Sequence, residues 1–360
     1  MRIGIIGLGD GGICNLRSFL QIQGQRVVAV CDNNEETIAR YCERYYNHGG
    51  YPYPSRNFHH LVEHKGVQLV VIATPDDKHL APTRAALEQG KYVFVEKPVA
   101  TTFSDLSSFH ELMLQYPRRI LFSEKYSFAH PIQAAFSHRR ELGEFMWGTT
   151  FYSMGNCARI LGGGKWRTET SYNPCAGGLS HNFMIALLFT NSPIARIRAR
   201  GEVLTYHQNL DHFGGFDFME GTLEFANGET LNWIVSLATK EANSPLGHRS
   251  IAHTFQFEHG SLMYGPTPES DQIIVNGHPI TFTHEPSVEE WDAYNIGTLY
   301  RKMHEDILAS IPLDKSRSLD NALPLHTISQ GINVAYACLA AFESAKNHGK
   351  WVYIPLDYST

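Results

Sequence analysis

The fold is restricted most strongly by a glycine-rich segment near the start of the chain. The segment Gly7-Leu8-Gly9-Asp10-Gly11-Gly12 has the spacing G-x-G-x-x-G, follows the apolar run 3–6 and precedes a helical pattern. In this setting Gly7 can form a tight turn, Gly9 lets the backbone approach a pyrophosphate, and Gly12 allows close contact between helix and strand. The order of these features predicts a dinucleotide site in a parallel βαβ unit.

An acidic residue follows at the distance that such a site requires. Asp32 ends the second strand-like run, roughly twenty residues after the glycines. A carboxylate there can accept hydrogen bonds from the adenosine ribose hydroxyls and would repel a 2′-phosphate, so NAD is expected rather than NADP. The alternative is a glycine-rich turn followed by a solvated aspartate. The predicted cofactor-binding residues of this region are Gly7, Gly9, Asp10, Gly11, Gly12 and Asp32.

Strand-like and helical patterns alternate through the first third of the chain. The strand-like runs are 3–6, 27–30, 69–73 and 92–95, and the helical patterns that follow them lie after Gly12 and at 35–46, 78–89 and 103–116. A further apolar run at 120–122 is expected to be a closing strand. This alternation is typical of a parallel sheet. We therefore expect an α/β Rossmann domain over residues 1–122.

The pattern changes after residue 123. A helical pattern at 130–140 precedes strand-like stretches at 146–154, 194–205, 216–225, 231–239, 254–258, 272–275 and 280–283, and helices are expected at 294–311 and 318–346, the last capped by Ser318. Asn227-Gly228 predicts a hairpin with a type I′ turn, which needs positive φ at both central residues. Residues 123–360 are therefore expected to form an α+β domain with a large, mostly antiparallel sheet that binds substrate and mediates oligomerisation.

Composition excludes several classes of partner. The formal net charge of −6 gives no reason to expect nucleic acid, which basic surfaces bind. The six cysteines contain no C-x-x-C pair, so neither a zinc knuckle nor a redox pair is indicated. No basic leader and no apolar span long enough for a bilayer is present, and we expect a cytoplasmic protein. His59-His60 and the group His207, Asp211, His212 lack a recognised ligand spacing, so no metal is expected.

Two further segments follow strands at the expected carboxyl edge of the parallel sheet. They are Thr74-Pro75-Asp76-Asp77-Lys78-His79 and Glu96-Lys97-Pro98. With the glycine segment, the Trp166-Arg167 and Ala176-Gly177-Gly178 region and the two closing helices, they make the chain similar to the glucose-fructose oxidoreductase, inositol dehydrogenase and MocA (Gfo/Idh/MocA) family. The resemblance spans nearly the whole chain, and Glu-Lys-Pro is its most specific element.

The resemblance implies that Lys97 lies beside the nicotinamide ring and the reacting carbon. Removal of hydride from an alcohol carbon requires the hydroxyl proton to leave, and an amine in a partly dry pocket can have its pKa lowered into the working range. The alternative is a surface lysine at a strand end. His79 is expected to hold its loop by bonding backbone carbonyls. The cofactor-binding residues implied here are Thr74, Pro75, His79, Glu96 and Lys97.

The resemblance also implies a catalytic histidine on the first helix of the second domain, with acids one turn before it and three residues after it. His181 is the only titratable side chain of the stretch 177–188. Counting back from the helix end at 191–193 places His181 at the histidine position, with Met184 replacing the trailing acid. Counting forward from the glycines places it at the leading aspartate position, with Ile185 at the histidine position. We favour the first placement, because histidine can pass a proton between substrate oxygen and an amine; a packing histidine is the alternative.

The expected substrate is a sugar, an inositol or a sugar derivative. An aromatic face beside hydrogen-bonding cations suits such polyhydroxylated ligands. The implied reaction is hydride transfer between NAD and a secondary alcohol or ketone. Two alternatives stay open: a cofactor-loaded sugar sensor, suggested by the missing acids near His181, and an NAD-dependent glycoside eliminase. An exposed sheet face predicts a homodimer or homotetramer. The predicted substrate-binding residues are Lys97, Lys125, Tyr126, Trp166, Arg167 and His181.

Overall fold

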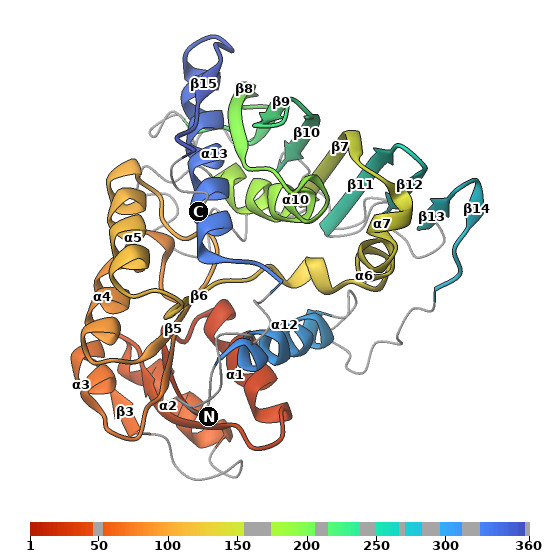
Figure 1. Ribbon diagram of the computed structural model, residues 1–360. Coiled ribbons are helices and arrows are strands. Elements are labelled where there is room, and N and C mark those ends of the chain that lie inside the picture. Colours follow the sequence, from red (N-terminus) through yellow and green to blue (C-terminus); the bar gives the residue numbers. More distant parts are fainter. Residues whose placement is uncertain are drawn as a thin grey trace. The chain divides into compact units, whose positions relative to one another are not determined.

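The computed structural model describes residues 1–45, 53–154, 174–205, 215–237, 249–265, 271–282, 296–311 and 325–356 (Figure 1). The chain divides into two compact units, which are described separately. Unit 1 comprises Met1–Lys125 and Pro286–Ile332, and unit 2 comprises Tyr126–Glu285 and Asn333–Thr360. Unit 1 thus includes a late segment that the sequence pattern placed in the second domain. The reason is that α12 (Ile296–Ser310) packs against α1 (Asp10–Gln21).

Unit 1 is built on a six-stranded parallel sheet with the strand order β3-β2-β1-β4-β5-β6. The central strand β4 is fully buried and entirely apolar, as expected for a parallel sheet covered on both faces. The predicted Rossmann-like sheet is therefore confirmed. Only the three-residue strand β3 was not predicted, because its sequence Tyr-Pro-Ser contains no apolar run. The strands are β1 (Arg2–Ile6), β2 (Arg26–Cys31), β3 (Tyr53–Ser55), β4 (Leu69–Ile72), β5 (Tyr92–Val95) and β6 (Ile120–Leu121).

The helices of unit 1 begin close to the predicted positions. Thr102 caps α5, because its side-chain oxygen accepts a hydrogen bond from the Asp105 amide at 3.1 Å. The predicted helix 78–89 is divided into a short 3₁₀ turn and α4, and the six-residue helix α3 was not predicted. Besides α1 and α12, the helical elements are α2 (Glu35–Tyr45), α3 (Phe58–Glu63), η1 (Asp76–Lys78), α4 (Leu80–Glu88), α5 (Phe103–Gln115) and η2 (Lys125–Phe128), which begins at the end of this unit.

Unit 2 contains a nine-stranded sheet in the order β14-β13-β12-β11-β7-β10-β9-β8-β15. Within the described residues, every neighbouring pair is antiparallel apart from β7 and β10. The predicted mostly antiparallel sheet is confirmed. The strands are β7 (Phe145–Met154), β8 (Ile194–Glu202), β9 (Phe218–Phe225), β10 (Thr230–Ser236), β11 (Arg249–Phe257), β12 (Gly260–Tyr264), β13 (Gln272–Val275), β14 (His278–Pro279) and β15 (Val352–Tyr353).

One turn of this sheet differs in type from the prediction, and a second tight turn was not predicted. Asn227-Gly228 does join β9 to β10, but only Gly228 has positive φ, at +91°, and its amide donates to the carbonyl of Phe225 at 3.0 Å. The loop is therefore a three-residue turn rather than type I′. Asn276 and Gly277, with φ of 50° and 80°, form the tight turn between β13 and β14. The strand expected at 280–283 is observed earlier, as β14 at 278–279, because the turn at Asn276-Gly277 brings the chain back beside β13 at that point. The Ile280 amide still donates to the carbonyl of Ile273 at 2.8 Å, and residue 283 lies outside the described part of the chain.

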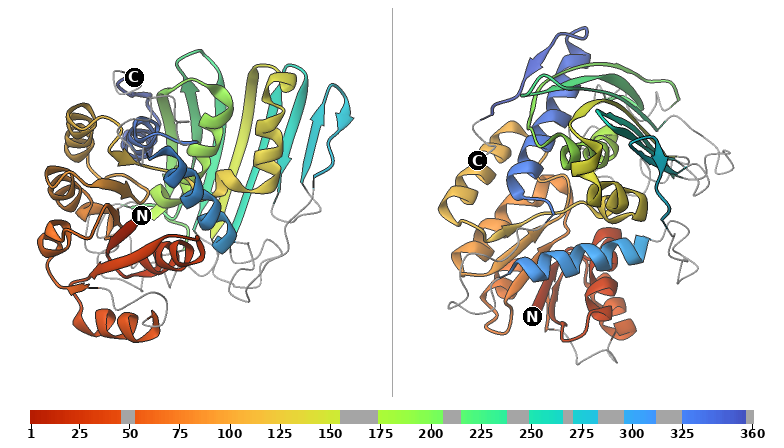
Figure 2. Two further views of the ribbon diagram at one scale, coloured as in Figure 1. Left: turned by 60° about the horizontal axis from the view of Figure 1, so that its bottom comes forward. Right: turned by 45° about the vertical axis from the view of Figure 1, so that its right-hand side comes forward.

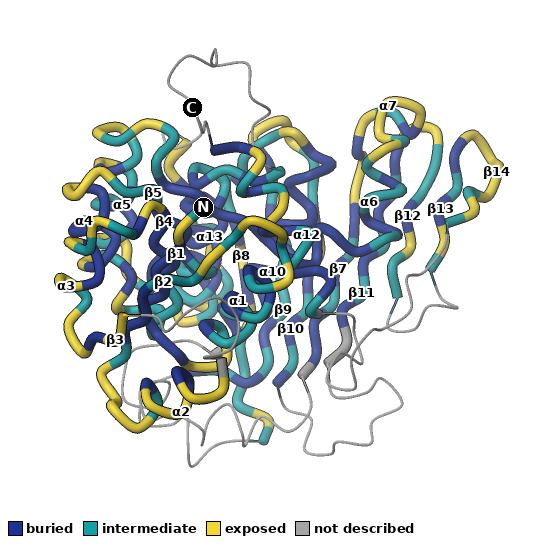
Figure 3. Tube along the Cα trace, turned by 90° about the horizontal axis from the view of Figure 1, so that it is seen from below, coloured by how far each residue is buried: buried dark blue, intermediate teal, exposed yellow. Residues whose placement is uncertain are grey.

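The helices of unit 2 lie on one side of its sheet (Figure 2). They are α6 (His130–Ser137), α7 (Arg139–Leu142), α10 (Pro174–Thr190) and α13 (Ile328–Lys346), which begins in unit 1. Helix α13 begins ten residues later than predicted, and residues 325–327 before it are not helical; Ser318, the predicted cap, lies outside the described residues. Helix α10 is mostly apolar, and its residues 175–190 are buried apart from the half-buried Gly177, which fits a place in the core of unit 2 (Figure 3). None of the described helices combines the length and the apolar character that crossing a bilayer requires.

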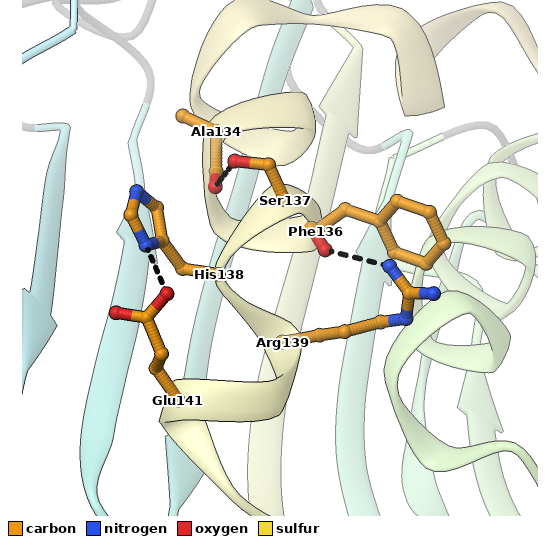
Figure 4. Close-up of polar contacts among 6 residues, drawn as sticks. All are labelled: Ala134, Phe136, Ser137, His138, Arg139 and Glu141. Carbon is orange, nitrogen blue, oxygen red and sulfur yellow. Dashed lines mark hydrogen bonds and ion pairs between the residues drawn. The ribbon is translucent and has the colours of Figure 1, made fainter.

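The predicted helix 130–140 is interrupted at His138 (Figure 4). The Ser137 hydroxyl donates to the carbonyl of Ala134 at 2.7 Å, and the Arg139 guanidinium donates to the carbonyl of Phe136 at 3.2 Å. The last carbonyls of α6 therefore accept hydrogen bonds from these side chains as well as from the His138 amide.

Candidate functional site

Two glycines of the predicted dinucleotide loop are required by close backbone contacts. Gly7 has φ +92°, and a Cβ there would lie 2.4 Å from the carbonyl oxygen of Ala73. A Cβ on Gly12 would lie 2.0 Å from the carbonyl oxygen of Gly7. Both distances are far below van der Waals contact, so the turn from β1 into α1 excludes any side chain at these positions.

The other two glycines border open space. Nothing lies within 4 Å of a Cβ built on Gly9 or on Gly11. Gly9 is the N-cap of α1 and provides no side-chain hydrogen bond, and Asp10 is exposed in the first turn. The first amides of α1 therefore face an open cradle at the positive end of a helix, which suits the pyrophosphate of a dinucleotide. These residues fit the predicted cofactor.

Asp32 lies directly after β2 and is held beside the glycine loop. Its Oδ2 accepts a hydrogen bond from the Leu8 amide at 2.8 Å, and its Oδ1 accepts one from the Asn34 amide at 2.9 Å. The side chain remains partly exposed. Each carboxylate oxygen has a further lone pair, so the group can still accept a hydrogen bond from a ribose hydroxyl.

His79 joins the loop after β4 to the loop after β5. Its Nδ1 lies 3.0 Å from the carbonyl oxygen of Pro98 and 3.2 Å from that of Val99, and its Nε2 lies 3.1 Å from that of Thr74. The ring is 1% exposed. His79 therefore contacts backbone carbonyls, as predicted, and links the loop that contains Thr74 to the loop that contains Pro98.

Lys97 lies two residues after the end of β5, with Glu96 between them, and is partly buried. Burial, followed by the positive charge of Lys125, lowers the pKa of Lys97 to about 8, against the opposing effect of nearby carboxylates. A substantial fraction of this side chain is therefore a neutral amine slightly above neutral pH. The carboxylates that act in the opposite direction are those of Glu124, Asp76 and Glu96.

Glu96 is anchored by residues that the sequence did not point to. Asn15 of α1 donates from Nδ2 to Glu96 Oε1 at 2.6 Å, and the hydroxyl of Tyr300 donates to the same oxygen at 3.4 Å. The Lys97 amide donates to Glu96 Oε2 at 3.3 Å. Asn15 could have been noticed as a polar residue on the buried stripe of α1, whereas nothing in the sequence connects Tyr300 to this loop.

The two consecutive residues Lys125 and Tyr126 contact different groups. Lys125 is 8% exposed, and its Nζ lies over the face of the Tyr300 ring, 5.4 Å from the ring centre, in a cation–π contact. The ring of Tyr126, the first residue of unit 2, meets His181 edge-on with centroids 4.8 Å apart.

His181 lies on α10 in unit 2 and is 3% exposed. The Tyr152 ring stacks on it at 5.9 Å, so His181 contacts two tyrosine rings. Gly178, one turn earlier, leaves room for this arrangement, because a Cβ there would lie 2.6 Å from the ring of Tyr152. Met184 and Ile185 are fully buried apolar residues. Two tyrosine rings thus contact the imidazole on this helix.

Several predicted residues lie outside the described part of the chain. These are Trp166 and Arg167, and also the histidine-containing group His207, Asp211 and His212. His59 and His60 are exposed on α3. Among the residues that the structure describes, no three histidine, cysteine or acidic side chains come together in a way that could hold a metal ion.

Comparison with known proteins gives a consistent result for the first unit. Residues 1–122 match the Gfo/Idh/MocA model, described as an oxidoreductase family with an NAD-binding Rossmann fold. The chain is 35% identical over 112 residues to a "Glycosyl hydrolase family 109 protein 2" of Shewanella sp. (strain ANA-3), covering 29% of this chain and 24% of the relative. It is 29% identical over 139 residues to a "1-carboxy-3-chloro-3,4-dihydroxycyclo hexa-1,5-diene dehydrogenase" of Comamonas testosteroni, covering 38% and 33%. The matches thus span a quarter to a third of these relatives.

Solved structures resemble the whole chain. A myo-inositol 2-dehydrogenase from Lactobacillus plantarum has a TM-score of 0.78 at 18% identity, with 99% of each chain covered. A levoglucosan dehydrogenase in complex with NADH and L-sorbose has a TM-score of 0.80 at 16% identity, with both chains covered completely, at 100%. At these identities the likeness establishes a shared fold over both units.

Proposed function

We propose that the whole chain is an NAD-dependent oxidoreductase. The premise is that residues 1–122 match the NAD-binding Rossmann domain of the Gfo/Idh/MocA oxidoreductase family. Its substrate would be a secondary alcohol, or the corresponding ketone, of a sugar, an inositol or a sugar derivative. The observation that carries this proposal is the partly buried amine of Lys97 in the loop after β5, with a pKa lowered to about 8.

In this reaction Lys97 would exchange the hydroxyl proton of the substrate. Bound NAD supplies the hydride acceptor or donor. The neutral amine of Lys97 accepts the proton as the alcohol is oxidised, and the ammonium returns it in the reverse direction. The pKa of about 8 suits both directions near neutral pH, because each protonation state is then well populated. Lys125 favours the neutral amine, and Glu96 opposes it.

NAD is proposed as the cofactor in preference to NADP. Gly9 and Gly11 leave space at the start of α1 for the pyrophosphate, and Asp32 presents its carboxylate at the end of β2. A 2′-phosphate on the ribose would bring two negative charges together there. Neighbours with NADH bound support a dinucleotide in this fold.

His181 is proposed as a substrate-contacting group of unit 2, with Tyr126 and Tyr152 beside it. Aromatic rings with a polar edge suit the apolar faces and hydroxyls of a polyol. Lys125, and also Trp166 and Arg167, remain predicted substrate contacts. The related fold binds L-sorbose in a levoglucosan dehydrogenase, which supports a carbohydrate-like substrate for this chain.

Substitution of Lys97 tests the assigned role directly. Lys97→Ala is expected to abolish turnover while the Kd for NAD changes by less than about threefold, because the amine contributes to proton transfer rather than to cofactor affinity. Lys97→Arg is the second variant, because it keeps the positive charge but cannot lose a proton near neutral pH. It should be equally inactive if deprotonation of the Lys97 amine, rather than its charge, is required. Full turnover in either variant would refute the role of Lys97.

A second candidate function is glycoside cleavage through transient oxidation, favoured by the relatives named glycosyl hydrolase family 109 proteins. Absorbance of NADH during incubation with sugars, inositols and glycosides separates the candidates. Net formation of NADH indicates a dehydrogenase, whereas cleaved product without net NADH indicates elimination. Binding with neither outcome indicates a sensor, the possibility raised by the missing acids near His181.

A second copy of the chain is proposed to cover the outer face of the unit 2 sheet. Tyr152 and Val235 face α10, so the alternate residues of β8, β9 and β10 point away from the helices. A hollow of about 430 Å³ on this sheet is lined by Arg198, Arg200, Glu220, Thr222 and Asn232, among others. Light scattering after size-exclusion chromatography should give a dimer or tetramer. The cytoplasmic location stays a prediction.

A further inference from the structure

Three polar side chains are buried where α1 and α12 meet within unit 1. Asn15 is 0% exposed, Ser18 is 2% exposed and His304 is 0% exposed. The surroundings are apolar: the His304 ring stacks on Phe19 with centroids 3.9 Å apart, and Phe94 meets it edge-on at 5.6 Å. Polar groups in such a place are costly unless each is hydrogen-bonded. Each of these three side chains therefore needs a hydrogen-bond partner.

The hydrogen bonds of Asn15 determine which group donates and which accepts in each of these contacts. Its Nδ2 lies 2.8 Å from the carbonyl oxygen of Gly11 and 2.6 Å from Glu96 Oε1, both of which are acceptors. The amide nitrogen therefore faces these two groups, and Oδ1 faces His304 Nε2 at 2.8 Å. Because Oδ1 can only accept, Nε2 must carry the proton.

The other ring nitrogen completes the sequence of donors. Nδ1 of His304 lies 2.7 Å from Ser18 Oγ, and in a singly protonated ring with the proton on Nε2 it accepts from that hydroxyl. Burial lowers the pKa of His304 to about 3, so the ring is neutral at physiological pH. The donors thus run in one direction: Ser18 to His304, His304 to Asn15, and Asn15 to Glu96.

The last acceptor in this series of hydrogen bonds is the carboxylate of Glu96, next to Lys97. We propose that Asn15 and His304 are positioning residues, which hold Glu96 beside Lys97 and tie it to the glycine-rich loop through the carbonyl of Gly11. The inference rests on the function proposed above, because it assigns these residues to the machinery of Lys97. Both lie in unit 1 but are 289 residues apart in the sequence.

The consequence concerns the charge balance at the Lys97 amine. The charged groups that act on it are Lys125 and Glu124 near η2, Asp76 of η1, and Glu96. Among these, Glu96 is the carboxylate that Asn15 holds by a direct hydrogen bond. If Glu96 turns away, a negative charge that favours the ammonium is lost, so the pKa of Lys97 should fall.

Two substitutions of His304 separate positioning from packing. In His304→Gln the terminal amide nitrogen can replace Nε2–H as the donor to Asn15, although the bond with Ser18 is lost. In His304→Asn the shorter amide can replace Nδ1 toward Ser18 but does not reach Asn15. Both variants remove the same aromatic stacking on Phe19, so each controls for the packing change of the other.

Three readouts are measured on the full-length protein. They are kcat and KM for a polyol substrate, the Kd for NAD from fluorescence titration, and the pH dependence of Lys97 labelling by acetic anhydride followed by mass spectrometry. We expect His304→Asn to lower the labelling pKa of Lys97, because Glu96 moves away from the side-chain amine. Although more of the amine is then neutral, kcat should fall at least about tenfold, with KM changed less than about threefold, because Glu96 Oε2 also accepts the hydrogen bond of the Lys97 backbone amide and a displaced Glu96 no longer holds this loop in place. His304→Gln should retain kcat and the labelling pKa within about threefold and about 0.3 pH units of the wild type.

Equal losses in the two variants would overturn the inference, because packing alone would then explain the effect. Asn15→Asp provides a second route should a His304 variant fail to fold: it keeps the acceptor for His304 but replaces the donor to Glu96 by a carboxylate oxygen. Wild-type turnover in Asn15→Asp would also overturn the inference. If the wild type shows no oxidoreductase activity, the proposed function fails, and the labelling of Lys97 in the two His304 variants still decides the positioning role.

Discussion

Replacement of Lys97 by methionine should stabilise unit 1 while removing its proposed activity. Methionine has a similar length and shape but carries no charge to bury. The wild-type ammonium is unfavourable in the folded state, since burial lowers the pKa of Lys97 from 10.5 to about 8. One pKa unit corresponds to about 1.36 kcal/mol, so the charged form lowers the free energy of unfolding by about 3 kcal/mol at most near pH 7.

The destabilisation caused by the Lys97 charge depends on pH between the folded and unfolded pKa values of this side chain. Below pH 8 the side chain is charged in both states, and the full penalty is present. Between pH 8 and 10.5 the unfolded chain binds the proton more tightly than the folded protein, so wild-type stability rises. Above pH 10.5 the amine is neutral in both states, and the penalty is absent. The advantage of Lys97→Met is therefore largest at and below neutral pH and disappears in alkaline solution.

Urea unfolding and thermal unfolding, both followed by far-UV circular dichroism near pH 7 and near pH 10.5, measure this difference. A gain of about 3 kcal/mol corresponds to a rise in Tm of roughly 6–12 °C for a unit of this size. Lys78→Met is the matched control, because the Lys78 side chain is 69% exposed and its removal should change stability by less than about 0.5 kcal/mol. An unchanged stability near pH 7 would refute the reasoning, and a gain that persists undiminished near pH 10.5 would assign it to packing instead of charge.

Three further predictions concern the same unit. Gly12→Ala should lower the free energy of unfolding by about 2–4 kcal/mol, because the new methyl group would meet the carbonyl of Gly7. Gly11→Ala, whose methyl group would point into open space, should raise it by up to about 1 kcal/mol through helix propensity. Thermal denaturation distinguishes the two variants. The kcat/KM for alcohol oxidation should rise with pH and level off near the Lys97 pKa of about 8, and a pH-independent profile would contradict the assigned base. Asp32→Ser should reduce the preference for NAD over NADP about tenfold in paired Kd measurements, and an unchanged ratio would remove Asp32 from cofactor selection.

Much of unit 1 could be predicted because its signals are local. The strand β1, the turn at Gly7 and the start of α1 lie within a few consecutive residues, and the periodicity of apolar residues changes at the turn. Asp32 could be assigned because parallel strands place their carboxyl ends at one edge of the sheet. Likewise, the Asn227-Gly228 pair indicated a hairpin, but its turn type depended on the φ angle of Asn227, which the sequence leaves free.

The sequence by itself therefore determined the parallel sheet, the glycine loop and the position of Lys97 after β5. Only the tertiary structure decided what surrounds that amine: α12 belongs to unit 1, His304 reaches Asn15 across 289 residues, and burial together with Lys125 lowers the pKa of Lys97. The physical reason is that periodicity and turn chemistry act between neighbours in the chain. Hydrogen bonds between buried side chains and the electrostatics of a partly buried charge depend instead on which distant segments pack together.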